Sequence, residues 1–177
     1  LAIHAAMTGH VVFSTLHTNS AIDSIPRLLD MKVEPYLIST TLNVVIAQRL
    51  VRKICTDCKE EVEIDDALKD EVIKELQDIS DDVLKGYGVT LDKPLFYHGA
   101  GCAKCGHSGE KGRTAITEAV ENTRALKKAI TTGMKQDDVA AALKEQKFIS
   151  MKQDGLLKVL MGATTLEKVL SVTKEEG

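Results

Sequence analysis

Aromatic residues are scarce in this chain: its 177 residues include three Phe, three Tyr and no Trp. Proteins that bind single-stranded nucleic acid normally stack the bases on aromatic side chains, so this scarcity argues against that class. A buried core must instead be built from Leu, Ile, Val, Ala and Met. The formal net charge of −3 also argues against a general binder of nucleic acid or of anionic membranes, because such proteins are normally basic.

Long apolar runs and a conventional start are missing as well. Charged residues make up 28% of the chain and interrupt every apolar stretch before it reaches the roughly 18 residues of a transmembrane helix. The chain opens at Leu1, inside an amphipathic segment, with no initiator Met and no signal peptide. We therefore expect the sequence to begin partway through a longer protein.

The phosphate-binding pattern G-x-x-x-x-G-K-[ST] of P-loop NTPases is also absent from the sequence. The glycine-containing stretch 106–112 does not have the required order of residues. Taken alone, the sequence predicts no ATP-hydrolysing machinery within these residues.

All four cysteines of the chain fall into two C-x2-C pairs, Cys55 with Cys58 and Cys102 with Cys105. Two residues between thiols let both sulfur atoms of a turn reach one tetrahedral ion, as in a zinc knuckle. The pattern favours one structural zinc ion held by all four thiolates. Two disulfides, which need an oxidising compartment, are one alternative, and a redox dithiol or iron site is another.

The segment between the two cysteine pairs, residues 59–101, contains an acidic stretch. Apolar residues recur in it at roughly helical spacing over residues 65–85. This pattern predicts a solvated helical hairpin that covers the metal site.

The first 50 residues predict a helix, a strand and two further helices. Residues 1–9 suit the end of a helix, and the β-branched run over 11–16 is typical of a buried parallel strand. Helices are expected over about 21–31 and 36–50. This order indicates an α/β sheet domain whose other strands precede residue 1.

Beyond residue 113 the sequence predicts helices to the end of the chain. They are expected over about 122–132, 136–146, 150–161 and 165–172. Ser150 with Gln153, and Thr164 with Glu167, have the spacing of capping boxes at helix starts.

Two histidines flank the strand expected over 11–16. His17 follows the strand, at the edge where open α/β sheets place their functional sites, and His10 precedes it. A histidine at such an edge suits contact with a terminal phosphate, or relay of the state of a catalytic site. On chemistry alone, a structural hydrogen-bonding role is the favoured interpretation.

Several motifs, in a fixed order, resemble those of the bacterial ATPases of type II secretion and type IV pilus assembly. The stretch 8–19, T-G-H-V-V-F-S-T-L-H-T-N, resembles the His box of that family. The likeness continues through 27–31, 33–35, 47–55, 101–105, 112–118, 151–156 and 162–170.

This resemblance implies an α/β fold in three segments. Residues 1–50 would be the C-terminal part of a RecA-like P-loop ATPase domain, 51–113 a tetracysteine zinc-binding module with the acidic insert, and 114–177 a helical C-terminal region. In the family, the phosphate-binding loop and the Walker B segment precede the His box. The resemblance therefore implies a C-terminal fragment that starts just after Walker B and is inactive by itself.

The resemblance also implies site residues. His17 and His10 match the His box as catalytic residues, and His17 is the better candidate for sensing the γ-phosphate. Arg113, in a Gly-Arg-Thr motif, resembles the arginine near the nucleotide base, although a structural salt bridge fits it equally well. Glu110 departs from the family, which usually has an aromatic residue there. The zinc ligands of the family match Cys55, Cys58, Cys102 and Cys105.

The whole protein is then expected to be a cytoplasmic homo-hexamer, peripheral at the inner membrane, that uses ATP and Mg²⁺. It would act on an inner-membrane platform protein and drive assembly of a pilus or pseudopilus and protein export. The alternative is a zinc-dependent module that binds protein or nucleic acid without catalysis. Only the basic residues Arg49, Arg52 and Lys53 support nucleic-acid binding, and the acidic insert opposes it, so we expect no nucleic-acid partner.

Overall fold

The computed structural model describes residues 2–173, which fall into two compact units. Unit 1 comprises the chain up to residue 47 together with residues 118–148, and unit 2 comprises residues 48–117 together with the chain from residue 149. The segment boundaries at residues 50 and 113 stay a prediction of the sequence.

Unit 1 is mainly helical. Pro35 starts one of its helices at a position where its missing N–H costs nothing, and the Thr123 hydroxyl caps another by accepting from the N–H of Leu126 at 3.3 Å. Its helices are α1 (Ala2–Met7), α2 (Ser24–Asp30), α3 (Pro35–Thr41), α6 (Arg124–Thr131) and α7 (Gln136–Glu145). They enclose a small aliphatic core of Ala21, Ile25, Ile38, Val120, Leu126, Ala129, Ile130 and Ala142.

Two long strands, β1 (Val44–Ile54) and β4 (Glu110–Glu121), pair into a two-stranded sheet. Each strand has one end in unit 1 and the other in unit 2. On β4, the side chains of Ile116, Glu118 and Val120 alternate into the interior. This is the period-2 burial of a strand with one covered face.

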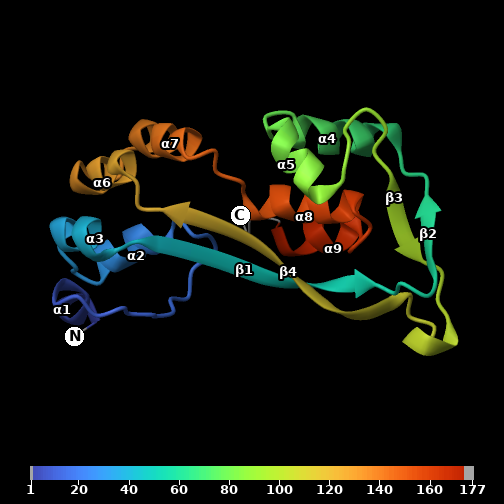
Figure 1. Cartoon of the computed structure of the whole chain (residues 1–177), viewed down its shortest axis with the longest axis horizontal. Helices are drawn as coiled ribbons and strands as arrows, with labels where there is room; N and C mark the ends of the chain where they lie inside the picture. The colour runs from blue at the N-terminus through green and yellow to red at the C-terminus, as the bar shows by residue number, and fades with distance from the viewer. Residues whose placement is uncertain (1, 174–177) are drawn as a thin grey trace. The chain divides into compact units, whose positions relative to one another are not determined.

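In its described residues, unit 2 combines a short two-stranded sheet with four α-helices (Figure 1). This sheet pairs β2 (Lys59–Val62) with β3 (Phe96–Gly99) antiparallel, with Lys59 opposite Gly99 and Val62 opposite Phe96. The other elements are α4 (Asp66–Leu76), α5 (Asp81–Tyr87), the 3-10 turn η1 (Ala103–Cys105), α8 (Met151–Leu160) and α9 (Leu166–Thr173). The core consists of Val72, Leu76, Leu84, Phe96, Leu156, Leu157, Val159, Leu160 and Val169.

The strand predicted over residues 11–16 is wrong. Residues 10–18 have no regular secondary structure, and Val11 and Phe13 are 83% and 94% exposed. An extended segment becomes a strand only when a neighbour accepts and donates its backbone hydrogen bonds. Among residues 2–173, no strand pairs with this segment.

Two other sequence predictions fail in the opposite way, because segments that were predicted as helical are strands. The helix expected over 36–50 ends at Thr41, and β1 begins at Val44. Residues 114–121, expected to lie in a helical region, belong to β4. Both segments are rich in β-branched residues, which favour strands. The apolar residues have helical spacing, but pairing between β1 and β4 outweighs that local signal and makes both segments strands.

The remaining helices form where the sequence predicted them. Helices α4 and α5 form in the insert predicted over 65–85, although α5 continues to Tyr87, and α6 to α9 lie within about two residues of their expected bounds. The expectation that this insert covers the metal site is wrong, because α4 and α5 pack against α8 in a core that contains none of the cysteines. Ser150 and Gln153 form the predicted capping box. Thr164 does not cap α9; its hydroxyl donates instead to the carbonyl of Arg52 at 2.7 Å. No helix among the described residues is long and apolar enough to cross a membrane.

Close packing of α8 against α9 makes Gly155 a sensitive position. A Cβ atom at Gly155 would lie 2.5 Å from Cγ1 of Val169 and 3.5 Å from Cγ2 of Ile116. The Gly155→Ala variant is therefore expected to lose about 1–3 kcal/mol of unfolding free energy through overpacking, measured by urea denaturation.

A matched control is Gly86 of α5, where a Cβ atom would meet nothing within 4 Å. Gly86→Ala is expected to gain about 0.5–1 kcal/mol, because alanine loses less backbone entropy than glycine on folding. A Gly155→Ala protein as stable as the parent would contradict the packing described for α8 and α9.

Candidate metal centre

The four cysteines lie in two short turns of unit 2. Cys55 follows β1 and Cys58 precedes β2, and the N–H of Cys58 donates to the carbonyl of Cys55 at 3.3 Å. In the second turn, the N–H of Cys105 donates to the carbonyl of Cys102 at 3.1 Å. Gly106 ends this turn with a φ of 62°, a left-handed conformation that glycine adopts without strain.

Backbone hydrogen bonds and two glycines hold the turns together. The N–H of Ala100 donates to the carbonyl of Cys58, and the N–H of Cys55 donates to the carbonyl of Gly109, both at 2.9 Å. Gly99 and Gly109 approach so closely that a Cβ atom on either would overlap the backbone of the other. Glycine at both positions therefore allows the two cysteine pairs to converge.

The sulfur geometry fits a single tetrahedral ion. All four Sγ atoms lie within 4.8 Å of one another. The Sγ atom of Cys105 lies 3.8 Å from that of Cys102 and 3.9 Å from that of Cys58. A tetrahedral zinc ion with Zn–S bonds of about 2.3 Å separates its sulfur ligands by about 3.8 Å.

The same distances decide against one alternative that the sequence left open. A disulfide requires sulfur atoms about 2.05 Å apart, and all four cysteines are free thiols. The four-cysteine cluster predicted from the spacing is confirmed as a group that could hold a metal ion.

Two of the thiols differ in how readily they ionise. The pKa of Cys105 is lowered to about 6, chiefly because the N–H of Cys102 donates to its sulfur at 3.2 Å. The pKa of Cys58 is raised, chiefly because desolvation disfavours its thiolate. A divalent ion bound among the sulfurs would supply the positive charge that Cys58 needs to lose its proton.

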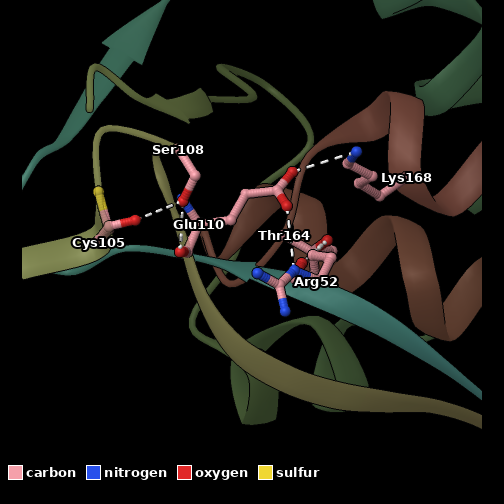
Figure 2. Close-up of polar contacts among 6 residues, drawn as sticks. All are labelled: Arg52, Cys105, Ser108, Glu110, Thr164 and Lys168. Carbon is pink, nitrogen blue, oxygen red and sulfur yellow. Dashed lines mark hydrogen bonds and ion pairs between the residues drawn. The ribbon is translucent and has the colours of Figure 1, made fainter. Parts of the chain in front are cut away.

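Glu110 lies between two cations (Figure 2). Its Oε2 atom is 3.1 Å from Nε of Arg52, and its Oε1 atom is 3.2 Å from Nζ of Lys168. Burial opposes ionisation of Glu110, but hydrogen bonds from Lys168 and Arg52 lower its pKa. The hydroxyl oxygen of Ser108 lies 2.7 Å from the carbonyl oxygen of Cys105 and 3.0 Å from that of Glu110, so its one proton can be donated to either carbonyl. This contact links the network to the second cysteine turn.

The sequence singled out Glu110 only because it stands where an aromatic residue was expected, and it gave no sign of the two ion-pair partners, Arg52 and Lys168. Arg52 lies on β1 and Lys168 on α9, and no spacing in a single sequence connects three residues so far apart. The network also uses one residue of the basic run near the first cysteine pair. Because Arg49 donates to the carbonyl of Val172 at 2.6 Å, two residues of that run have structural partners, which weakens the support for nucleic-acid binding.

The histidines of the predicted site lie in unit 1 and Arg113 lies in unit 2. His17 is exposed, and Nδ1 of His10 lies 3.0 Å from the Thr8 hydroxyl and 3.2 Å from the carbonyl of Ala5. Arg113 is exposed on β4. Nucleotide-related roles for these residues stay predictions.

Comparison with known proteins identifies the family. The family described as "Type II/IV secretion system protein" matches residues 1–171, so the chain belongs to it and the resemblance read from the motifs is confirmed. The chain is 42% identical to type II secretion system protein E of Dickeya dadantii and 41% identical to type II secretion system ATPase E of Vibrio cholerae. It is 39% identical to the type IV pilus assembly ATPase PilB of Pseudomonas aeruginosa.

These relatives are much longer than the chain. Each alignment covers 99% of this chain, but only 32% of the Dickeya and Vibrio proteins and 29% of the Pseudomonas protein. The chain thus spans about a third of their length. Their names describe the activities of the whole proteins.

Proposed function

We propose that this chain is the C-terminal part of a motor ATPase that drives pilus or pseudopilus assembly and protein export. The family match over residues 1–171 carries the proposal. Relatives named for type II secretion and for type IV pilus assembly are similarly close, at 41% and 39% identity. Identity therefore favours neither system.

In this proposal, residues 1–50 belong to a RecA-like ATPase domain that is completed elsewhere in the whole protein. The chain lacks the pattern G-x-x-x-x-G-K-[ST], so binding of ATP and Mg²⁺ requires the rest of that domain. His17 would sense the γ-phosphate, with His10 in the same box, and Arg113 would lie near the base. Phosphoryl transfer to water depends on positioning and charge stabilisation, for which imidazole and guanidinium groups are suited.

We also propose that the four cysteines hold zinc. Four thiolates form a closed tetrahedral set, which leaves no ligand position open for water or substrate. The ion would therefore have a structural role, fixing the two cysteine turns against each other. The 3.8 and 3.9 Å separations of the sulfur atoms support zinc with its Zn–S bonds of about 2.3 Å.

The partners follow from the family resemblance alone. The whole protein would be a homo-hexamer on the cytoplasmic side of the inner membrane, where it acts on a platform protein of the secretion or pilus machine. Nucleotide-driven movement of its domains would be transmitted to that platform.

The proposal predicts how ATPase activity depends on His17. In the whole protein, His17→Ala is expected to lower kcat by about 10²-fold or more, because the charge developing on the γ-phosphate loses a stabilising group. The isolated chain is expected to show negligible hydrolysis. Phosphate release by the purified whole protein, with and without the substitution, is the measurement.

His4→Ala is the matched control, since His4 is an exposed histidine of α1 outside the His box. It is expected to leave kcat unchanged. Equal activity of the His17→Ala protein and its parent would remove His17 from the mechanism. Hydrolysis by the isolated chain, purified free of other ATPases, would show that it holds a nucleotide site of its own.

A further inference from the structure

We infer that the ion pair of Asp57 and Lys104 stabilises the metal-bound state of the four cysteines, because the Lys104 ammonium offsets the repulsion between the Asp57 carboxylate and the cysteine thiolates. We call this ion pair the clasp. The two residues occupy the same place in the two pairs, directly before Cys58 and directly before Cys105. The clasp rests on the proposed metal site but assigns a role to two residues that are not ligands.

The carboxylate of Asp57 faces the two turns with its two oxygen atoms. Its Oδ1 atom forms an ion pair with Nζ of Lys104, which belongs to the other turn. Its Oδ2 atom accepts from the thiol of Cys55, with the sulfur and the oxygen 3.9 Å apart. One carboxylate therefore joins the first turn, which contains Asp57 itself, to the second.

Metal binding changes the sign of one of these contacts. Cys55 donates to Asp57 only as a thiol, and a zinc ligand is a thiolate. A zinc ion with four thiolates has a net charge of −2, so the bound state places a second anion beside the Asp57 carboxylate. The ammonium of Lys104 offsets this repulsion, because it is held against the same carboxylate.

The inference predicts an asymmetry that an ordinary surface ion pair lacks. A solvent-exposed pair contributes little, and removing either partner has a similar small effect. In the clasp, loss of Lys104 leaves an unpaired carboxylate beside the thiolates. Loss of the Asp57 charge removes the repulsive group itself and leaves Lys104 free to attract the sulfurs.

The test is the rate at which the zinc-loaded protein releases zinc to an excess of a chromogenic chelator. Lys104→Met is expected to release zinc about tenfold faster or more. Removing a residue that contacts the metal ligands, without itself binding the metal, typically lowers metal affinity by about 10-fold to 100-fold. Asp57→Asn is expected to stay within about twofold of the parent. The double variant is expected to recover most of the loss, and Lys104→Arg, which keeps the charge, is expected to match the parent.

The matched control is Lys69→Met, which removes the exposed 2.9 Å ion pair with Asp66 in the same unit and is expected to leave the rate unchanged. Equal acceleration by Lys104→Met and Asp57→Asn would overturn the clasp. If Lys104→Met does not fold, as judged by circular dichroism, a tenfold acceleration in Asp57→Asn alone overturns it too. A parent protein without zinc would contradict the metal site instead, so the two failures are distinguishable.

Discussion

Removing the metal from the loaded protein is expected to unfold the β2–β3 sheet and both cysteine turns while the packed helices of unit 2 stay folded. The loaded protein is expected to contain about one zinc ion per chain, because one tetrahedral ion uses all four thiolates. With free zinc at about 1,000 times its dissociation constant, removal would cost about 4 kcal/mol of unfolding free energy.

Unfolding on metal loss is expected to stay local because few residues near the cysteines are buried. Within residues 55–62 and 96–109, only Cys55, Phe96 and Gly109 are buried, so the cysteine end of the β2–β3 sheet has almost no apolar core. The 3-10 turn η1 lies beyond the start of β2 and the end of β3, away from α4, α5, α8 and α9 (Figure 1). Those helices share a hydrophobic core to which β3 adds Phe96 and which does not include the cysteines.

Amide hydrogen exchange before and after chelation measures the prediction. Protection is expected to fall in residues 55–62 and 96–109 and to persist in α8. Cys58→Ser is expected to reproduce the loss, whereas Ala103→Ser, an exposed change between two ligands, is expected to retain the metal. Iron in the metal analysis, or exchange that does not respond to chelation, would contradict a structural zinc site.

The cysteine cluster was the part of the site most accessible from sequence. A C-x2-C pair is a local pattern, because its two sulfur atoms share one turn whatever the rest of the chain does. The helices α6 to α9 were accessible for the same reason, since capping and apolar spacing are short-range signals. Convergence of Gly99 and Gly109 could not be seen in the sequence, because nothing local distinguishes a close approach from a turn.

The errors fall where long-range pairing decides the conformation. Residues 44–50 continue the apolar spacing of α3, but they pair with β4, which begins more than fifty residues further along the chain. Residues 11–16 have the composition of a buried strand and lack a partner among the described residues. In both cases local composition was compatible with two structures, and the presence or absence of a pairing strand selected one.

Asp154 of α8 is the position in unit 2 where a single substitution is expected to be most damaging to stability. Its side chain is only 4% exposed, and its Oδ2 atom lies 2.6 Å from Nζ of Lys158. The N–H of Thr117 donates to Oδ2 at 2.7 Å, and the hydroxyl of Tyr87 donates to Oδ1 at 2.8 Å. One buried carboxylate thus connects α8 with β4 and α5.

Asp154→Ala is expected to lower the unfolding free energy by about 3–5 kcal/mol, because it leaves a largely buried lysine without its carboxylate and removes the acceptor of three donors of Thr117 and Tyr87. Asp154→Asn keeps the shape and part of the hydrogen bonding, so its expected loss is smaller, about 1–3 kcal/mol. Burial and the nearby carboxylate raise the pKa of Tyr87 to about 12, which keeps its hydroxyl protonated as a donor at neutral pH. Urea denaturation at fixed zinc concentration is the measurement.

The comparison that isolates the buried charge is with Glu75→Ala, which breaks the more exposed 2.7 Å ion pair with Lys152. That variant is expected to lose less than about 1 kcal/mol, because solvent screens an exposed pair. The double variant Asp154→Ala/Lys158→Met removes both charges, so its loss is expected to fall short of the sum of the two single losses by about 1 kcal/mol or more. An Asp154→Ala protein that loses no more than the Glu75→Ala protein would mean that the packing around α8, and not this carboxylate, holds β4 and α5 in place.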